Sequence, residues 1–241
     1  MDWYIFSIIA LFCYGIQNFL YKVSAEKKCN TAWTTFSFML TVAVLSSILF
    51  FVLKESVSNL FLLLFIAFLN AITFLTTTIA SIESLKRIPT STAYPLIRLS
   101  IVIVVLFSIF YFKDSLSLYQ ILGVILTVLV ILILTKNNNQ KEVDKNFGLG
   151  ILLTIVAIIA GAATTIIQKF AAVMVNQLGY IAISYIYNVF FSWGLRKKLQ
   201  TGRENPKHNN ALIIGFFLGL FNFVGFYMIL KAFSIGPLSL V

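Results

Sequence analysis

Residues 84–136 read "SLKRIPTSTAYPLIRLSIVIVVLFSIFYFKDSLSLYQILGVILTVLVILILTK", and this one segment indicates the fold class. It contains two apolar runs, at 91–112 and 117–135, separated by a short polar turn. Each run has about the 20 residues that a helix rising about 1.5 Å per residue needs to cross a hydrocarbon core about 30 Å thick. Strands of a membrane barrel would instead alternate polar and apolar residues in segments of about ten. The segment therefore predicts two membrane-spanning helices.

Runs of the same kind occupy most of the chain. Hydrophobic residues make up 60% of the sequence and charged residues only 11%, against about 25% charged residues in soluble proteins. The mean hydropathy is +0.96. We expect eight spans, at 3–21, 32–53, 59–82, 91–112, 117–135, 147–170, 178–195 and 211–232. The prediction is an all-α polytopic membrane protein.

The net charge of +10 is informative through its placement. The loops after the first, third, fifth and seventh spans hold 13 lysines and arginines. The opposite side holds only Lys54, Lys113, Lys169 and Lys231. Basic loops face the cytoplasm under the positive-inside rule, so we expect the N-terminus to lie outside. Because the basic residues lie in the loops of a membrane protein, we expect no nucleic-acid partner.

Two pairs of segments resemble each other across the chain. "YGIQNFLYK" (14–22) aligns with "GAATTIIQK" (161–169), since each has polar residues in its middle and a lysine at its end. "SLKRIPTSTA" (84–93) aligns with "AFSIGPLSLV" (232–241) at an offset of 148 residues, which pairs proline with proline and serine with serine. Together these matches predict an internal duplication.

The duplication divides the chain into a first repeat at 1–135, a polar loop at 136–146 and a second repeat at 147–241. A repeat of five helices crosses the membrane an odd number of times, so the two copies must have opposite orientations. Such an inverted repeat is typical of many secondary transporters. Because Val241 aligns with Ala93, we expect the second repeat to be incomplete, without its last two helices.

Small residues on the third helix of each repeat predict close helix packing. The offset of 148 residues aligns Ala67 and Ala71 with Gly215 and Gly219, and small residues four apart let helix backbones approach closely in lipid. Without the last two helices of the second repeat, we expect Gly215, Gly219 and Asn222 to lack neighbours and to face lipid.

Residues 84–136 and "KAFSIGPLSLV" (231–241) resemble the half-repeat of the drug/metabolite transporter superfamily, EamA type, which is related to the small multidrug resistance proteins. The resemblance implies a ten-helix inverted-repeat permease for small metabolites, amino acids or organic cations, with the substrate site between the halves. The sequence departs from the pattern in two ways. Tyr14 stands where the small multidrug resistance proteins carry an essential carboxylate. Family members also usually have cytoplasmic termini, whereas the charge count places Met1 outside.

Polar side chains within the expected spans are the candidates for a substrate pathway, because each is unfavourable at lipid depth unless it faces a cavity or a partner. The first span, for example, carries four of them on one face, with helical spacing. The alternative is interhelical hydrogen bonding worth about 0.6 kcal/mol per bond, which would serve packing alone. The pathway candidates are Tyr14, Gln17, Asn18, Asn70, Thr73, Thr77, Tyr94, Arg98, Thr164, Gln168, Tyr185, Asn188 and Asn222.

Arg98 is the one charged residue well inside an apolar run, and two interpretations of it stay open. It either binds an anionic substrate group or a carboxylate partner, or it extends to the basic side and meets Glu83 or lipid headgroups. Pro95 lies one turn before it and predicts a kink, or a break that frees backbone carbonyls toward a cavity.

Motifs for catalysis are missing. The single histidine, His208, cannot build a histidine-based metal site, and no P-loop is present, so we expect no enzymatic activity, no cofactor and no metal. No Asp or Glu falls at mid-span, which favours uniport or exchange over a carboxylate proton relay.

Two functions are compatible with the sequence. The first is a transporter working by alternating access in the prokaryotic cytoplasmic membrane, with the bilayer and a small-molecule substrate as its partners. The second is a non-transporting membrane subunit or truncated remnant that packs against a partner. A homo-oligomer is compatible with both.

Overall fold

The computed structural model describes residues 2–114, 147–200 and 208–239, with isolated residues between 118 and 133, and these residues form only helices, turns and short connections. The prediction of an all-α fold is confirmed. The expected fifth span at 117–135 lies mostly outside the described residues. The polar loop at 136–146 and Val241 lie outside them entirely.

Seven helical segments in the described part are long and apolar enough to cross a membrane. Their bounds agree with the expected spans to within a few residues at most ends. The helices are α1 (Trp3–Glu26), α2 (Thr31–Val52), α3 (Leu60–Leu85), α4 (Thr90–Arg98), α5 (Ser100–Phe107), the π-helix η1 (Ser108–Phe112), α7 (Phe147–Met174), α8 (Gln177–Gln200) and α9 (His208–Ile235).

Local chemistry explains where several helices begin and end. The side chains of Asn30 and Asn59 cap α2 and α3, accepting from the main-chain N–H groups three residues later. The chain leaves α1, α2 and η1 through Lys28, Lys54 and Lys113, whose φ angles are 49°, 50° and 54°. This left-handed conformation closes a helix and is more often adopted by glycine.

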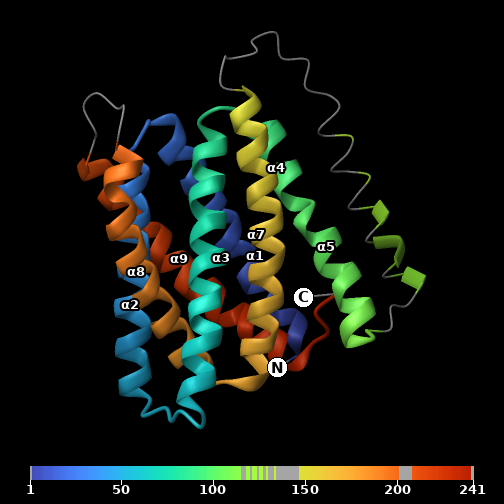
Figure 1. The fold of residues 1–241 in the computed structure, drawn as a ribbon. Helices are drawn as coiled ribbons and strands as arrows, with labels where there is room; N and C mark the ends of the chain where they lie inside the picture. The colour runs from blue at the N-terminus through green and yellow to red at the C-terminus, as the bar shows by residue number, and fades with distance from the viewer. Residues whose placement is uncertain are drawn as a thin grey trace.

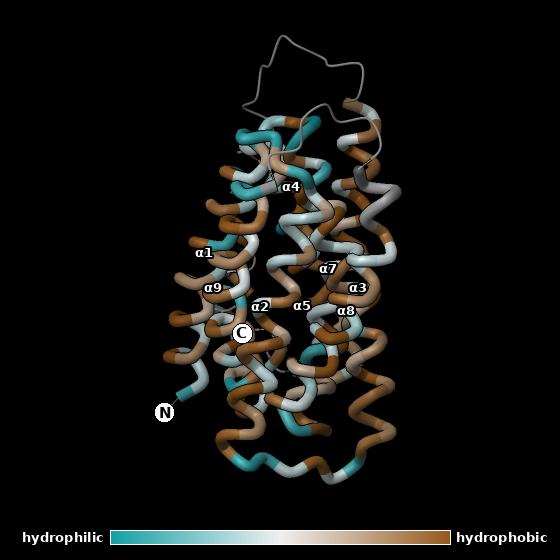
Figure 2. Tube along the Cα trace, turned by 90° about the vertical axis from the view of Figure 1, so that its left-hand side faces the viewer, coloured by the Kyte–Doolittle hydropathy of each residue, from teal (hydrophilic) through white to brown (hydrophobic). Residues whose placement is uncertain are grey.

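The helices form a bundle with two polar ends. Figure 1 shows the α1–α2 turn, the α3–α4 turn, the start of α7 and the end of α8 at one end. The N-terminus, the α2–α3 loop and the α7–α8 turn lie at the other. Hydrophilic residues gather at both ends, with mostly hydrophobic helix between them (Figure 2). The described parts of the basic loops therefore share one end of the bundle.

Each of the helices α1, α2 and α3 packs mainly against a helix of the set α7, α8 and α9. Helix α1 packs on α9, α3 packs on α7, and α2 packs on α8. Helix α2 also packs on α9, and α3 on α8. Figure 1 shows α1 and α7 running in opposite directions, as do α2 and α8, and α3 and α9.

The fourth span is interrupted, where a continuous helix over 91–112 was one expectation. Helix α4 ends at Arg98 and α5 begins at Ser100, and the N–H of Leu99 bonds to the carbonyl oxygen of Leu96 at 2.9 Å, a tightened turn. Pro95 has no N–H to donate to the preceding turn, and a proline within a helix commonly causes such a break.

The expectation that Gly215, Gly219 and Asn222 face lipid is wrong. A Cβ at Gly215 would lie 2.6 Å from the carbonyl oxygen of Thr34, and one at Gly219 would lie 2.5 Å from Cβ of Thr41, so α9 sits directly on α2. Asn222 is 1% exposed. The two glycines have no side chain to hold α2 away, and α2 therefore covers this face of α9.

Candidate functional site

A buried chain of hydrogen bonds joins three helices near the middle of the bundle. The amide nitrogen of Asn222 donates to Oε1 of Gln17 at 3.0 Å, and Nε2 of Gln17 donates to the Tyr21 hydroxyl at 2.7 Å. The Tyr185 hydroxyl donates to Oδ1 of Asn222. All four side chains are at most 6% exposed. We call Gln17, Tyr21, Tyr185 and Asn222 the Asn222 network. It connects α1 with α8 and α9.

Aromatic rings surround the Asn222 network. The Tyr185 ring lies 5.6 Å from the Phe74 ring, 5.9 Å from Phe226 and 6.1 Å from Phe38, measured between centroids. These rings exclude water, and hydrogen bonds in such a low-dielectric setting are strengthened while unpaired polar groups become more costly.

Two buried asparagines have no hydrogen-bond partner among the described residues. Asn70 on α3 and Asn188 on α8 are both 0% exposed, and neither the amide oxygen nor the amide nitrogen of either side chain is paired there. Helices α3 and α8 pack against each other. A buried polar group left unpaired costs about 1–3 kcal/mol, so such groups in a folded protein call for an explanation.

A second polar group connects α4 with α1. The Tyr94 hydroxyl donates to the main-chain oxygen of Asn18. One turn further along α4, Arg98 lies in the neighbourhood of Tyr94 and Tyr14. Its side chain is exposed, and among the described residues its guanidinium forms no ion pair and no hydrogen bond.

Glu83 does not pair with Arg98, so of the interpretation in which Arg98 extends to the basic side, only contact with lipid headgroups remains. Its Oε2 lies 2.6 Å from the Arg87 guanidinium, and its Oε1 lies 3.2 Å from the Lys86 ammonium. The Thr31 hydroxyl also donates to Oε1. The Glu83 side chain is only 11% exposed, so these contacts form a compact ionic cluster at the basic end of the bundle.

A second cluster lies at the opposite end. The Lys169 ammonium donates to the carbonyl oxygens of Phe233 and Gly236, each at 2.7 Å. Oδ2 of Asp114 accepts from the main-chain N–H of Ser239 at 3.2 Å and from its hydroxyl at 3.0 Å. The Ser108 hydroxyl donates to the same oxygen. This cluster ties the end of the fourth span to α7 and to the turn after α9.

The remaining pathway candidates are more ordinary. The hydroxyls of Thr73, Thr77 and Thr164 each donate to a carbonyl oxygen four residues earlier in their own helix, at 2.8–3.0 Å. This is the usual way in which threonine satisfies its hydroxyl within a helix. Gln168 is buried on α7, and the Asn18 side chain is half-buried. Ala67 and Ala71 are fully buried on α3.

Sequence reasoning missed both end clusters and one face of α8. The spacing of Glu83, Lys86 and Arg87 is a signal for the first cluster, since residues three and four apart meet on a helix. The four-residue spacing of Tyr180, Ser184 and Asn188 likewise marks a single polar face of α8. The second cluster has no local signal, because its residues are far apart in the sequence.

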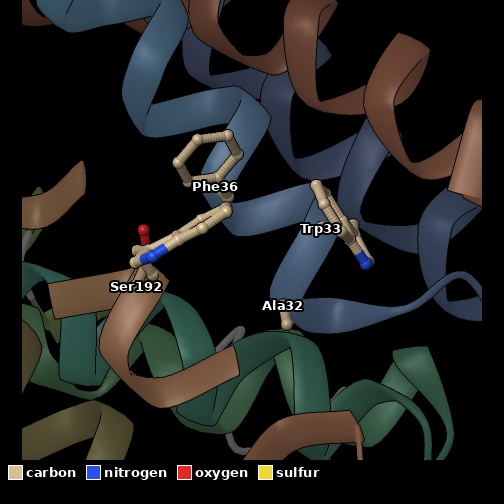
Figure 3. A pocket seen from close by; sticks show the side chains of 5 residues that line it. Ala32, Trp33, Phe36 and Ser192 are labelled. Atoms are coloured by element: carbon tan, nitrogen blue, oxygen red, sulfur yellow. The ribbon is translucent and has the colours of Figure 1, made fainter. Parts of the chain in front are cut away.

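A small pocket between α2 and α8 is not a substrate site. It is lined by Ala32, Trp33, Phe36, Ser192 and Trp193 (Figure 3), and its volume is about 10 Å³. That is close to the minimum for a single water molecule. The Trp33, Phe36 and Trp193 rings pack edge-to-face or tilted, with centroids 5.3–6.4 Å apart, so no metabolite fits there without movement of α2 or α8.

The half of the chain that contains α1 to η1 matches a known family. The model of the EamA-like transporter family matches residues 1–136, just over half of the sequence. The chain belongs to the EamA-like transporter family. A search of curated proteins found no significant match. The resemblance predicted from residues 84–136 is thus confirmed, and the protein is an integral, multi-pass member of a family of membrane transporters.

Proposed function

We propose that this EamA-family protein carries small metabolites, amino acids or organic cations across the prokaryotic cytoplasmic membrane by alternating access. The observation that carries the proposal is the pair of fully buried amides of Asn70 and Asn188, which have no hydrogen-bond partner among the described residues. Asn188 lies one turn after Tyr185 on α8, and Asn70 lies one turn before Phe74, whose ring packs on Tyr185. Both amides are free to bond with a substrate during transport.

A purely structural role does not account for these amides. An apolar side chain of similar size at either position would fill the same space without the desolvation cost of an unpaired amide. The amides of Gln17 and Asn222 are different, because they bond to each other and so contribute to packing. Among the described residues, Asn70 and Asn188 are the buried side chains with two unpaired polar atoms each, so both keep hydrogen-bonding capacity that the fold does not use.

The helix packing supports an inverted repeat with the first repeat at 1–135 and the second at 147–241. If α7, α8 and α9 are the counterparts of α1, α2 and α3, then the α1–α9 contact maps onto the α7–α3 contact. The α2–α9 contact maps in the same way onto α8–α3. Repeats of this kind rock against each other around a shared site in many secondary transporters.

We propose that the concentration gradient of the substrate alone drives transport. Within the described spans, Glu83 is engaged at the basic end and Asp114 lies beyond the end of its span, so neither is positioned as a mid-membrane proton carrier. Uniport or substrate exchange needs no such carboxylate.

The experiment is flux into liposomes containing the purified protein, with labelled amino acids and organic cations as a panel. Asn70→Leu and Asn188→Leu should each lower flux at least tenfold. The free energy of unfolding should stay unchanged or rise by up to about 1–3 kcal/mol, because an unpaired amide is removed. Ser46→Ala is the matched control, since Ser46 is buried on α2 but bonds only to its own helix at Val42 and Ala43.

Two outcomes would contradict the proposal. Full flux in both leucine variants would show that the amides have no part in transport. Absence of flux for every compound, from folded protein, would favour the non-transporting membrane subunit.

A further inference from the structure

We propose that Arg98 binds the carboxylate of the transported molecule, with Tyr14 and Tyr94 beside it, so that the substrates are small carboxylate-bearing metabolites. The inference rests on the proposed transport function and narrows it, because cations without a carboxylate are then excluded.

The position of Arg98 places its charge deep in the membrane. Tyr14, which lies in the neighbourhood of Arg98, is the twelfth of the 24 residues of α1 and lies midway along that helix. Arg98 itself is the ninth residue of the span Thr90–Phe112. At about 1.5 Å per residue it lies about 12 Å from the start of that span.

A charge at this depth requires compensation, and the described residues do not supply it. Arginine stays protonated in proteins and presents five N–H donors. A charged side chain within a membrane span is costly and in most cases faces a cavity, a partner or a water-filled path. Both oxygens of Glu83 are engaged by Lys86 and Arg87, and Asp114 accepts from Ser239 at the far end of the span. Arg98 therefore has binding capacity to spare.

The chemistry of the site favours a carboxylate over a phosphate. The planar guanidinium matches a carboxylate in a two-point hydrogen-bonded pair. One positive charge neutralises one negative charge, whereas a phosphate dianion would leave a net charge in a low-dielectric setting. Two other lysines of the spans are already engaged: Lys22 pairs with Glu26 at 3.7 Å, and Lys169 binds carbonyl oxygens at the end of α9.

Two local features add to the attraction. The helix break at Leu99 ends α4 at Arg98 and starts α5 at Ser100, so a helix N-terminus lies two residues after Arg98. Broken helices present anionic substrate groups with such ends in other transporters. Tyr94 holds α4 against α1 through its bond to Asn18, which makes it a positioning residue for Arg98.

The test is thermal unfolding of the detergent-solubilised protein with matched pairs of compounds, each a free amino acid and its primary amide. The free amino acids should raise the melting temperature of the wild type, and the amides should bind at least tenfold more weakly. Arg98→Gln should abolish the difference, and Arg98→Lys should keep part of it. Lys54→Gln is the control, because it removes the same charge from an exposed turn.

The stability of the variant without ligand is a second readout. If Arg98 is uncompensated, Arg98→Gln should be at least as stable as the wild type, whereas a structural arginine would make the variant less stable. Equal stabilisation by amino acids and amides, stabilisation that persists in Arg98→Gln, or no stabilisation by any carboxylate would each overturn the inference.

A lipid headgroup is the competing occupant. Adding phosphatidylglycerol in place of phosphatidylcholine should not reproduce the effect of the amino acids. An Arg98-dependent stabilisation by phosphatidylglycerol, with none by amino acids, would overturn the inference and assign Arg98 to lipid. Liposome flux that persists in Arg98→Gln would leave the transport function standing and remove only this inference.

Discussion

The ammonium of Lys169 donates to the carbonyl oxygen of Phe233 at 2.7 Å, and through this bond α7 holds the end of α9. Carbonyl groups in the last turn of a helix lack intrahelical partners, so a lysine there satisfies them and complements the helix dipole. The aligned lysine of the first repeat, Lys22, behaves differently. It pairs with Glu26 at 3.7 Å, and its side chain is 43% exposed.

This asymmetry leads to a prediction about the transport cycle. Lys169→Met should open the end of the bundle around the turn after α9, because two carbonyl oxygens lose their donor. A cysteine at Ser239, which is 9% exposed, should then react severalfold faster with a membrane-impermeant maleimide, in a background lacking Cys13 and Cys29. Lys169→Arg should keep the slow rate. An unchanged rate in Lys169→Met would contradict a closing role for the lysine.

Asp114 should make stability depend on pH below the ordinary carboxyl range. Partial burial raises the pKa of Asp114, but hydrogen bonds from Ser108 and Ser239 and the charge of Lys169 outweigh this effect, so its pKa lies below 3.8. A lowered folded-state pKa adds stability that is present above the ordinary pKa and is lost as the pH falls through the lowered one.

The measurement is the melting temperature between about pH 6 and about pH 3, a range that includes the ordinary aspartate pKa. Asp114→Asn should flatten the fall at the acid end of this range and should lower the melting temperature at the upper end. Glu26→Gln is the control, since exposed ion pairs contribute little. An identical acid profile for Asp114→Asn and the wild type would refute the assignment.

Gly219 should not tolerate a side chain. Its substitution by alanine would place a Cβ 2.5 Å from Cβ of Thr41 and 3.0 Å from the carbonyl oxygen of Phe38. Overpacking of this kind costs about 1–3 kcal/mol. Gly15→Ala is the matched control, because nothing lies within 4 Å of its Cβ position, and it should gain up to about 1 kcal/mol from helix propensity. Thermal unfolding of both variants decides the point; equal stabilities would mean that α2 and α9 are farther apart.

The orientation in the membrane is predicted from the placement of basic residues. Cysteines at Asp2 and at Gln140 should label from opposite sides, and only the cysteine at Asp2 should react with an impermeant reagent added outside the cell. Labelling of the cysteine at Gln140 alone from outside would reverse the predicted orientation.

The sequence named several residues of the candidate site but did not predict which of them contact one another. The spacing of Gln17 and Tyr21 places both on one face of α1, and their hydrogen bond follows from that spacing. Asn222 was recognised as a polar residue within a span, but the lipid environment expected for it was wrong. Its partners Gln17 and Tyr185 are distant in the sequence, and no local sequence pattern predicts contacts between residues so far apart.

Apolar runs of about 20 residues are enough to predict membrane-spanning helices, because the free energy of transferring a segment into lipid adds up residue by residue along the chain. The spans, their all-helical character and the segregation of basic loops therefore followed from the amino-acid order alone. Which polar groups find partners depends on the rotation and closeness of helices from distant parts of the chain. Packing at Gly215 and Gly219 brought α2 onto α9, and α1 and α8 supplied the partners of Asn222, while Asn70, Asn188 and Arg98 were left without partners among the described residues. Only the tertiary structure could distinguish the polar residues that have partners from those that do not, since the same residue types occur in both groups.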